Sequence, residues 1–157
     1  MKQSSKKSAI RNSYGFTLVE IMIVVAIIGL LAAIAIPNLL RARMTANEGS
    51  IKYDLRTFSS ANESYRSAMS DPSYAASLND LIVTSPGYLD SSWSSNPKHG
   101  FNLTYTPATI TYSLLAEKES SNTSGKDYCV DQTGIIRTAE SGLVADATGC
   151  SGGSAIS

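Results

Sequence analysis

A single glutamate lies inside a long apolar run of the sequence. Glu20 is the only ionisable side chain between Phe16 and Ile36, and a run of roughly 20 apolar residues is long enough to cross a hydrocarbon core. An acidic side chain at the centre of a spanning helix costs about 2.5–3.5 kcal/mol, so this carboxylate needs a partner. The chemistry that the residue offers is pairing with a positive charge in apolar surroundings.

Three interpretations of the apolar run compete. A secretory signal peptide would end at a small-x-small site such as Ala33-Ile34-Ala35. Glu20 weakens the apolar core of such a signal, and the run exceeds the usual length of about 7–15 residues. A permanent single-span anchor explains the length but leaves Glu20 unpaired. In the third interpretation the chain is cut between Gly15 and Phe16, so that the new amine can attract the Glu20 carboxylate of the same chain or of a neighbour.

The stretch GFTLVEIMIVVAIIGLLAAIAIP, which begins at Gly15, resembles the N-terminus of type IV prepilins and of the related type II secretion pseudopilins. The resemblance implies a leader that ends at Gly15 and a mature chain that begins with N-methylated Phe16. It also implies that Glu20 meets the N-terminal amine of an adjacent subunit and sets the register of stacked helices. Gly29 and Pro37 stand at family positions. A carboxylate in the first helical turn also stabilises its own helix, by a fraction of a kcal/mol.

The formal net charge of zero hides an uneven distribution of charge. Residues 1–15 carry four of the thirteen basic side chains and no acidic one, which leaves nine basic against thirteen acidic residues in the rest. Only Arg41 and Arg43 follow the apolar run closely, so the positive-inside bias predicts a cytoplasmic N-terminus and an exported remainder. The basic residues of that remainder are scattered, so no direct nucleic-acid binding is expected.

Beyond Pro37 the sequence pattern changes from uniformly apolar to amphipathic. Apolar residues recur at steps of three, four or seven, which predicts one long helix that continues to about Met69. Pro37 lacks an N–H group and should kink or loosen this helix near Ile36, with Gly29 as a second weak point. The recurring positions are Leu40, Met44, Ile51, Leu55, Phe58, Tyr65 and Met69.

The rest of the chain carries signals of a small sheet. A short helix is predicted over residues 74–83, and strands over residues 101–106, 109–117, 127–130 and 134–139. The segment Asp131-Gln132-Thr133-Gly134 is predicted to be a hairpin with glycine at a position of positive φ. An antiparallel meander with one face on the amphipathic helix gives an α+β fold, and the resemblance implies the same pilin-like architecture.

Two cysteines, Cys129 and Cys150, lie late in the exported part, where an oxidising compartment would allow them to pair. The tail over residues 140–157 is rich in small residues and would be mobile without such a bridge, which would stabilise the fold by about 3 kcal/mol. A cysteine-closed segment near the C-terminus is also typical of pilins. The alternative is two unrelated buried thiols. With one histidine, His99, and no Cys-x-x-Cys pattern, no metal site is expected.

No pattern in the sequence indicates catalysis. The chain lacks Gly-x-Ser-x-Gly and a phosphate-binding loop, and His99 lies in an apparent loop, so no enzyme activity and no cofactor are expected. Asp127, Asp131 and Asp146 could converge on calcium, as in some pseudopilins, although three acids in loops are usually just solvated. The aromatic residues Tyr53, Phe58 and Tyr65 on the predicted helix are interpreted as core packing rather than as a path for electrons.

The sequence therefore predicts a filament subunit in three parts: a cleaved leader over residues 1–15, a transmembrane and filament-core segment over 16–37, and an amphipathic helix with a globular head over 38–157. The resemblance implies a type IV pilus used for adhesion, twitching motility or uptake, or alternatively a periplasmic type II secretion pseudopilus. The implied partners are other pilin subunits, a prepilin peptidase and the pilus assembly machinery. The chain would reside in the inner membrane, with its head in the periplasm, before it joins an extracellular pilus.

Overall fold

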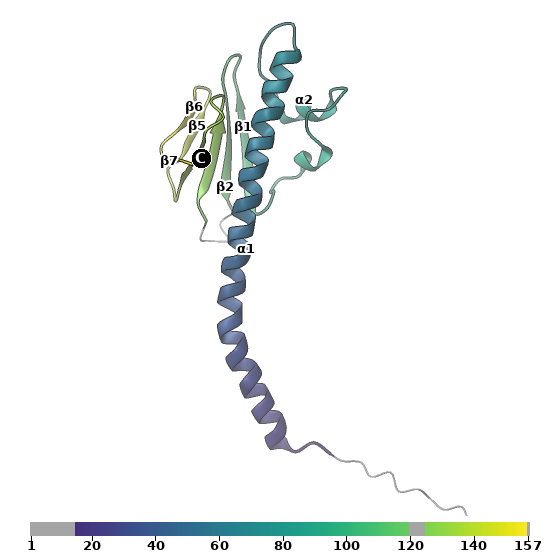
Figure 1. The fold of residues 1–157 in the computed structure, drawn as a ribbon, viewed down its shortest axis with the longest axis vertical. Helices are drawn as coiled ribbons and strands as arrows, with labels where there is room; N and C mark the ends of the chain where they lie inside the picture. Colours follow the sequence, from purple (N-terminus) through teal and green to yellow (C-terminus); the bar gives the residue numbers. More distant parts are fainter. Residues whose placement is uncertain (1–14, 120–124, 157) are drawn as a thin grey trace, which may run out of the picture. The chain divides into compact units, whose positions relative to one another are not determined.

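The computed structural model describes residues 15–119 and 125–156, which fall into two compact units that divide after Leu40. One helix, α1 (Leu18–Ala68), contributes to both units, and its assignment continues through Pro37 (Figure 1). The described part of the first unit consists of the beginning of α1 and the three residues before it. The second unit, called the head below, contains the rest of α1 and all other elements. The α+β fold predicted from the sequence is confirmed.

The head contains two short helices and seven strands among its described residues. The short helices lie on the other side of α1 from the sheet (Figure 1). The capping box of α2 joins Ser77 and Asp80, and Asp80 also lies in the first turn, where a carboxylate is favourable. The elements are α2 (Leu78–Val83), the 3-10 helix η1 (Ser91–Ser94), β1 (Phe101–Pro107), β2 (Tyr112–Lys118), β3 (Asp127–Asp131), β4 (Ile136–Ala139), β5 (Val144–Asp146), β6 (Gly149–Ser151) and β7 (Ser154–Ile156).

Five strands form an antiparallel sheet in the order β1-β2-β3-β4-β7. Because side chains alternate between the two faces of a strand, each row of paired residues lies on one face. One row is apolar and belongs to the core face: Tyr105, Leu114, Val130, Ile136 and Ile156. The next row, on the other face, is Thr104, Leu115, Cys129, Arg137 and Ala155. The register therefore places Cys129 on the face opposite the core.

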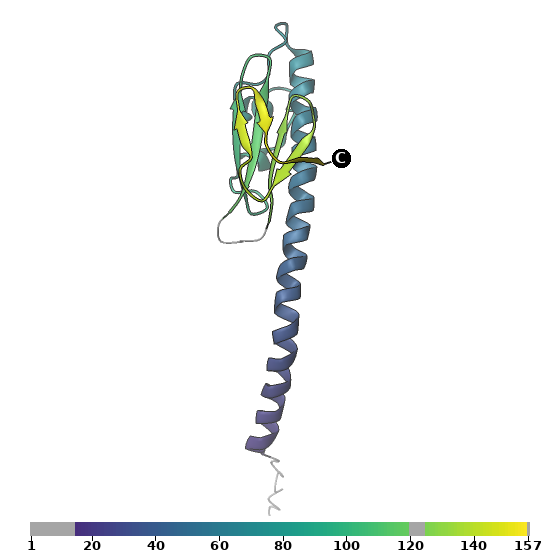
Figure 2. The same ribbon diagram turned by 90° about the vertical axis from the view of Figure 1, so that its left-hand side faces the viewer.

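The strands β5 and β6 form a separate two-stranded sheet that lies on that opposite face (Figure 2). The hydroxyl of Ser113 on β2 donates a hydrogen bond to the carbonyl of Asp146 at 2.9 Å. The disulfide between Cys129 and Cys150 joins the two sheets. The head thus has three layers, formed by α1 with the short helices, the five-stranded sheet, and the β5–β6 pair.

The core lies between α1 and the five-stranded sheet. Ile51, Leu55 and Phe58 on α1 are completely buried there. The ring of Phe58 meets Tyr105 and Tyr112 edge-on, with ring centroids 5.2 and 5.6 Å apart, and pairs of this kind stabilise by about 0.5–1.5 kcal/mol beyond their burial. The predicted apolar stripe therefore forms the core at its centre but not at its two ends, where Leu40 and Met69 are exposed.

One aromatic assignment from the sequence is wrong. Tyr53 is 70% exposed, whereas Phe58 is fully buried and Tyr65 packs at the edge of the core. Tyr53 and Phe58 are five residues apart, and at about 100° per residue they point in directions roughly 140° apart on the helix. A spacing of five therefore separates the two rings onto different faces.

The edge of β1 is closed by the segment that precedes it. The side-chain amide of Asn96 donates a hydrogen bond to the carbonyl of Leu103 at 3.1 Å and accepts one from its N–H at 2.9 Å. The backbone of Lys98 exchanges both of its hydrogen bonds with Phe101. Unpaired strand edges invite pairing with another chain, and these contacts remove that possibility over the first half of β1.

The structure contains the helix and strands predicted from the sequence, but some of them begin at later residues. The largest difference from the prediction lies in the tail. The predicted helix over residues 74–83 begins only at Leu78, since Ser77 acts as its N-cap. The predicted strands over 109–117 and 134–139 begin three and two residues later than expected, because turns occupy their first residues. The tail over residues 140–157, predicted to be mobile without the disulfide, carries the disulfide and contributes β5, β6 and β7.

Candidate assembly site

The first half of α1 carries large apolar side chains that are exposed to solvent. From Leu18 to Leu40 the large apolar residues are all at least half exposed. Among the described residues, α1 is the one helix long and apolar enough to cross a membrane. Burial of such a surface is worth roughly 25 cal/mol per Å². The surface therefore strongly favours association with lipid or with other helices.

The helix begins with a capping box formed by Thr17 and Glu20. The backbone N–H and the hydroxyl of Thr17 donate hydrogen bonds to Oε2 of Glu20 at 2.8 and 2.7 Å, and the N–H of Glu20 donates to the Thr17 hydroxyl at 3.2 Å. Such a box satisfies amide groups that a helix N-terminus leaves without partners. Glu20 thus does stabilise its own helix, as the sequence allowed.

Only one oxygen of the Glu20 carboxylate takes part in the capping box. Among the described residues, Oε1 accepts no hydrogen bond. A carboxylate can accept about four hydrogen bonds, so Glu20 retains capacity for a second partner. Sequence reasoning did not identify Thr17 as part of this site. The signal was present, since Thr17-Leu18-Val19-Glu20 has the Thr-x-x-Glu spacing of a capping box.

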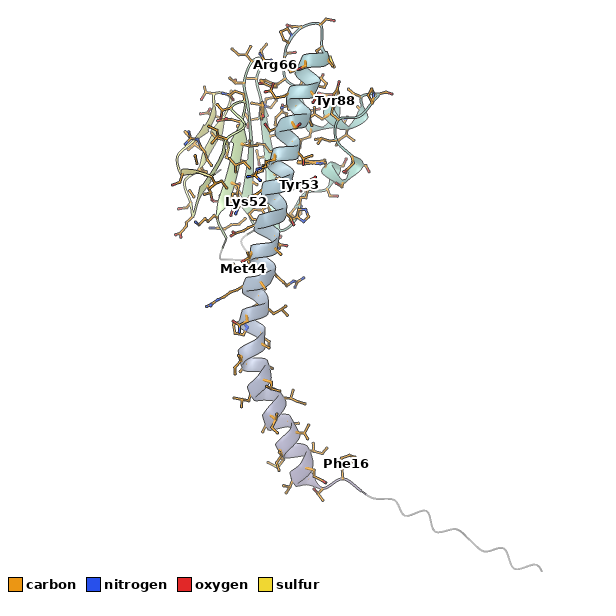
Figure 3. All side chains as sticks on the ribbon, in the orientation of Figure 1. Phe16, Met44, Lys52, Tyr53, Arg66 and Tyr88 are labelled. Atoms are coloured by element: carbon orange, nitrogen blue, oxygen red, sulfur yellow. A yellow bond between two sulfur atoms is a disulfide. The ribbon has the colours of Figure 1, made fainter. Side chains whose placement is uncertain are left out.

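The two residues of the predicted cleavage site lie just before the helix. Gly15 and Phe16 precede the first helical residue, and the Phe16 side chain is 83% exposed (Figure 3). Among the described residues, a Cβ atom added to Gly15 would meet nothing within 4 Å beyond its chain neighbours. The peptide bond between Gly15 and Phe16 therefore lies in open, non-helical backbone, which is the form in which a peptidase can reach it. The rest of the predicted leader lies outside the described residues.

Gly29 and Pro37, the two predicted weak points, both lie within the continuous helix. Among the described residues, a Cβ atom added to Gly29 would meet nothing within 4 Å beyond its chain neighbours and the backbone of its own helix. Pro37 cannot donate a hydrogen bond to the carbonyl four residues earlier. In the next position the side-chain amide of Asn38 donates to the carbonyl of Ile34 at 3.1 Å. A bend at either residue remains a prediction.

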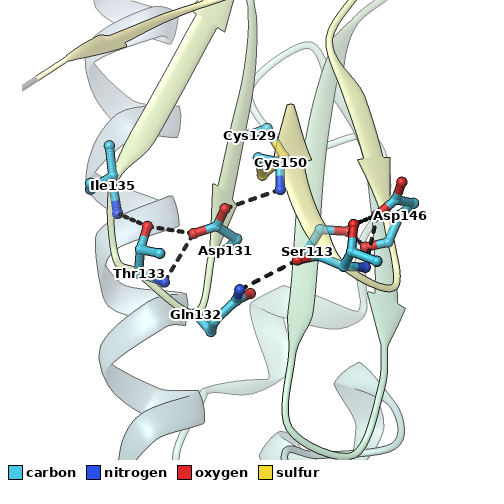
Figure 4. The surroundings of a disulfide bond; sticks show 9 residues. Ser113, Cys129, Asp131, Gln132, Thr133, Ile135, Asp146 and Cys150 are labelled. Atoms are coloured by element: carbon cyan, nitrogen blue, oxygen red, sulfur yellow. Dashed lines mark hydrogen bonds between the residues drawn. A yellow bond between two sulfur atoms is a disulfide. The ribbon is translucent and has the colours of Figure 1, made fainter. Parts of the chain in front are cut away.

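The predicted disulfide lies at the other end of the chain, inside the head. Cys129 on β3 and Cys150 on β6 are joined with their Cα atoms 6.0 Å apart, and both residues are buried (Figure 4). The carboxylate of Asp131 accepts a hydrogen bond from the N–H of Cys150 at 3.0 Å. Gly149 has a φ of +131°, and an added Cβ would come within 3.0 Å of Asp131. Glycine at this position therefore allows β6 to approach β3.

The three aspartates considered for calcium do not come together. Asp131 Oδ1 accepts hydrogen bonds from the N–H and the hydroxyl of Thr133, and Asp146 Oδ1 accepts the equivalent pair from Thr148. Asp127 lies at the opposite end of β3, where it accepts a hydrogen bond from the N–H of Lys118. Within residues 15–119 and 125–156, no three acidic, histidine or cysteine side chains form a cluster that could hold a metal ion.

Asp131 and Asp146 instead begin two turns that share one sequence pattern and the same hydrogen bonds from threonine. The sequences Asp131-Gln132-Thr133-Gly134 and Asp146-Ala147-Thr148-Gly149 share the pattern Asp-x-Thr-Gly, and each connects two antiparallel strands. Gly134 has a φ of +71°, as predicted for the first turn. Burial opposes ionisation of Asp131, but its hydrogen bonds from Thr133 and Cys150 outweigh burial and hold its pKa below the ordinary value. The second turn was not recognised from the sequence.

His99 pairs with an acidic residue rather than standing alone in solvent. Its Nε2 atom lies 3.2 Å from Oδ2 of Asp54 on α1, and the Nζ atom of Lys98 lies 3.3 Å from the same oxygen. Lys98 also lies over the ring of Trp93, 3.9 Å from its centroid, which is a cation–π contact. These contacts attach the segment before β1 to α1, and this arrangement is structural.

Comparisons with known proteins find similarity both in the N-terminal segment and in the head. Residues 10–36 match the family model of the prokaryotic N-terminal methylation motif. The chain is 33% identical over 120 residues to the type IV wide pilus major component PilA4 of Thermus thermophilus, which covers 76% of this chain and 72% of that protein.

Two further relatives match shorter stretches. The type IV major pilin protein PilA of Myxococcus xanthus is 49% identical over 51 residues, which covers 32% of this chain and 23% of that protein. The type II secretion system core protein G of Pectobacterium carotovorum is 35% identical over 72 residues, which covers 41% of this chain and 46% of that protein. No solved structure is significantly similar to the chain.

Proposed function

Since the chain belongs to the type IV pilin family, we propose that it is the structural subunit of a type IV pilus and that it polymerises through the first half of α1. The observation that carries this proposal is the match to PilA4. Only 40 residues precede the head, so most of the 120 matched residues fall within it. The likeness to a pilus subunit is therefore not confined to the N-terminal motif.

Maturation begins with cleavage after Gly15 by a prepilin peptidase, followed by methylation of the new amine of Phe16. The match of residues 10–36 to the methylation motif supports both steps, and the open backbone at Gly15 and Phe16 suits a peptidase. Cleavage leaves the capping box intact, because both residues that form it, Thr17 and Glu20, lie beyond the cut. The mature helix therefore starts with its carboxylate already oriented.

Glu20 then pairs with the Phe16 ammonium of an adjacent subunit. Thr17 holds Oε2 of the carboxylate, and Oε1 is left to accept the ammonium of the neighbour. In an apolar bundle, an ammonium without a partner would cost several kcal/mol, so a helix inserted at the wrong depth is disfavoured. The charge pair sets the depth of each incoming helix, and the exposed apolar side chains provide the adhesion.

Before assembly the subunit resides in the inner membrane, with its N-terminus in the cytoplasm and its head in the periplasm. The excess of basic residues before the span supports this orientation. Residues 1–15 form the leader, 16–37 the spanning segment, and 38–157 the amphipathic helix with the head. The partners are further copies of the chain, the prepilin peptidase and the assembly machinery. The finished pilus serves adhesion, twitching motility or uptake.

The alternative is a type II secretion pseudopilin, because a core protein of that system also matches the chain. That match covers 41% of the chain, against 76% for PilA4. The disulfide that closes the C-terminal part of the head also suits a pilin. Long external filaments labelled through this chain would distinguish a pilus from a short periplasmic pseudopilus.

The Glu20→Ala variant tests the proposed mechanism of assembly. Removal of the charge should make membrane insertion easier by about 2–3 kcal/mol, whereas assembly should fail or slow sharply. Glu20→Gln, which keeps the length of the side chain without its charge, should resemble Glu20→Ala. Glu117→Ala, which removes an exposed carboxylate on β2, is the matched control and should assemble normally.

The measurement compares sheared, pelleted filaments with the membrane pool, after mass spectrometry has shown that each variant begins with methylated Phe16. Wild-type filament yield from processed Glu20→Ala would contradict the role of the charge pair. A mature chain that begins near Ile36 would instead indicate a signal peptide and contradict the proposed maturation.

A further inference from the structure

The chain leaves the five-stranded sheet after β4 and returns to it at β7. The hairpin formed by β5 and β6 lies between these two strands in the chain, and β4 and β7 pair with each other. Two residues, Gly152 and Gly153, connect β6 to β7; both have positive φ, and a Cβ atom added to Gly153 would collide with the carbonyl of Thr138 on β4. Backbone pairing therefore attaches both ends of the hairpin to the sheet, in addition to the bond between Cys129 and Cys150.

Side chains of the head also hold the hairpin at its turn. Three consecutive carbonyls, at positions 146 to 148, accept hydrogen bonds from side chains outside the hairpin. The donors are the hydroxyls of Thr111 and Ser113, around the start of β2, and the side-chain amide of Gln132, just after β3. The bonds from Ser113 and Gln132 measure 2.9 and 3.4 Å (Figure 4). Ser113 is completely buried; a buried hydroxyl needs a partner, and the hairpin supplies it.

The carboxylate of Asp131 holds the hairpin as an acceptor. Its Oδ2 atom accepts a hydrogen bond from the N–H of Cys150 at 3.0 Å, and its Oδ1 atom accepts two from Thr133. Hydrogen bonds to an ionised group are roughly twice as strong as those between neutral groups. Thr133 lies in the turn between β3 and β4, so it orients the carboxylate independently of the hairpin. The four residues that reach the hairpin, called the docking residues below, are Thr111, Ser113, Asp131 and Gln132.

The cysteine side chains favour the same arrangement without a bond between them. Cys129 and Cys150 are both buried, and a free thiol behaves as a small apolar group that prefers burial. A disulfide stabilises a protein mainly by restricting its unfolded chain, so it need not position anything in the folded state. The folded position of the hairpin then depends on the groups that contact it there.

We propose that the docking residues position the β5–β6 hairpin on the sheet even when Cys129 and Cys150 are reduced. The hairpin then lies in the same place with or without the disulfide, in contrast to a tail that is mobile without the bridge. A subunit with reduced cysteines therefore presents the same head surface to its partners. The inference concerns the fold of one subunit and does not depend on the proposed function.

Amide hydrogen exchange tests the proposal in a chain that cannot form the disulfide. The full chain with Cys129→Ser and Cys150→Ser, called the serine variant below, is studied in detergent micelles. The N–H of residue 150 bonds to Asp131 only while the hairpin is docked, so its protection from exchange reports the docked fraction. We expect this amide to exchange more slowly in the serine variant than in an unstructured peptide.

Ser113→Ala, added to the serine variant, identifies the source of the protection. It removes the donor to the Asp146 carbonyl but leaves the partner of the residue-150 amide in place, so it can act on this amide only by loosening the hairpin. The loss of one buried hydrogen bond should lower the protection about tenfold. Asp127→Ala is the matched control. It removes an acceptor at the other end of β3, so it should speed exchange at Lys118 and leave residue 150 unchanged.

Alkylation of the wild-type chain after reduction provides a second measurement, on the natural side chains. Cys129 on β3 and Cys150 on β6 are buried where the two strands meet, so one opening of the hairpin should expose both thiols. A maleimide reagent should therefore modify both slowly. Ser113→Ala should speed both reactions about tenfold, whereas Asp127→Ala should not change them.

Three outcomes would overturn the proposal. The first is fast exchange at residue 150 in the serine variant while the amides of β2 and β3 stay protected, because the disulfide would then position the hairpin. The second is an unfolded head both in the serine variant and in the reduced wild type. The third is protection that Ser113→Ala leaves unchanged, because the pairing of β4 with β7 would then suffice without the docking residues. All three leave the proposed pilus subunit to be tested by filament formation.

Discussion

The two halves of α1 contain similar apolar side chains but obtain their burial from different sources. In the first half, residues such as Ile27 and Leu31 are more than half exposed, whereas in the second half Ile51 and Leu55 are completely buried. The second half is covered by the sheet and by the segment that contains α2 and η1, both supplied by the same chain. Among the described residues the first half has no such cover, which is consistent with the proposal that a membrane or other subunits bury it.

The two halves of α1 therefore contribute to two different free energies: that of folding the head, and that of membrane insertion and assembly. Substitutions in the second half of α1 should change the free energy of unfolding of the head. Substitutions in the first half should change membrane residence and assembly while leaving the head intact. The following predictions test that separation, from the largest expected effect to the smallest.

Phe58→Ala should destabilise the head by about 3–5 kcal/mol, because it removes a fully buried ring and leaves a cavity among Tyr105, Tyr112 and Trp93. Urea unfolding of the full chain in a mild detergent, followed by near-ultraviolet circular dichroism, measures the change. Ile27→Ala is the matched control, since it removes an exposed apolar side chain from the first half. Equal destabilisation by both variants would contradict the separation.

Loss of the disulfide should lower the free energy of unfolding of the head by about 3 kcal/mol. It should leave the first half of α1 unaffected. Cys129→Ser should lower the urea midpoint, and the double variant with Cys150→Ser should not lower it much further, because the two residues form one bond. Alkylation of the native protein should modify neither cysteine before reduction. Two freely labelled thiols would show that the bridge is absent.

The head should lose stability in acid through the two Asp-x-Thr-Gly turns. The pKa of Asp131 is held below its ordinary value by hydrogen bonds that outweigh burial, and the pKa of Asp146 is lowered by hydrogen bonds from Thr148. A lowered pKa in the folded state stabilises above the pKa of the unfolded state, and this contribution is lost as pH falls through the folded pKa.

In the wild type, the midpoint temperature of thermal unfolding should therefore fall as the pH is lowered from 6. Asp131→Asn should be less stable than the wild type at neutral pH and should show a smaller loss in acid, since one of the two carboxylates no longer titrates. An unchanged pH profile in Asp131→Asn would show that this turn contributes nothing to acid sensitivity.

The smallest effect is expected at the start of the first half. Thr17→Val should destabilise the first helical turn by about 1 kcal/mol, the typical cost of losing an N-cap, because the N–H of Glu20 loses the hydroxyl that accepts its hydrogen bond. Faster amide hydrogen exchange at residues 18–21 in detergent micelles would measure the loss. Thr17→Ser keeps the hydroxyl and should exchange like the wild type, with the head unaffected in both variants.

Features that depend on neighbouring residues could be predicted from the sequence. The apolar run, the amphipathic continuation of α1 and the first Asp-x-Thr-Gly turn each follow from a few consecutive residue types, as does the positive φ of Gly134. The capping box of Thr17 could have been found in the same way. The Cys129–Cys150 pairing could also be predicted, because the chain has only two cysteines.

Features that depend on partners distant in the sequence could not be predicted. The tail has weak strand propensity, yet it forms β7 because β4 offers an edge, and it forms β6 because the disulfide and Asp131 hold it on the outer face. The exposure of Tyr53, by contrast, could have been predicted, because its spacing of five from Phe58 places it on another face of α1.

By itself, then, the sequence determined that this chain has an apolar helix with one carboxylate near its start and a small disulfide-bonded head, and it predicts a cleavage boundary before the helix. These features are local, because hydrophobicity, charge and capping act within a few residues. The tertiary structure decided which apolar side chains the chain buries by itself and which of them stay exposed. It did so because burial requires surfaces from distant segments, and among the described residues the head buries apolar side chains of the second half of α1.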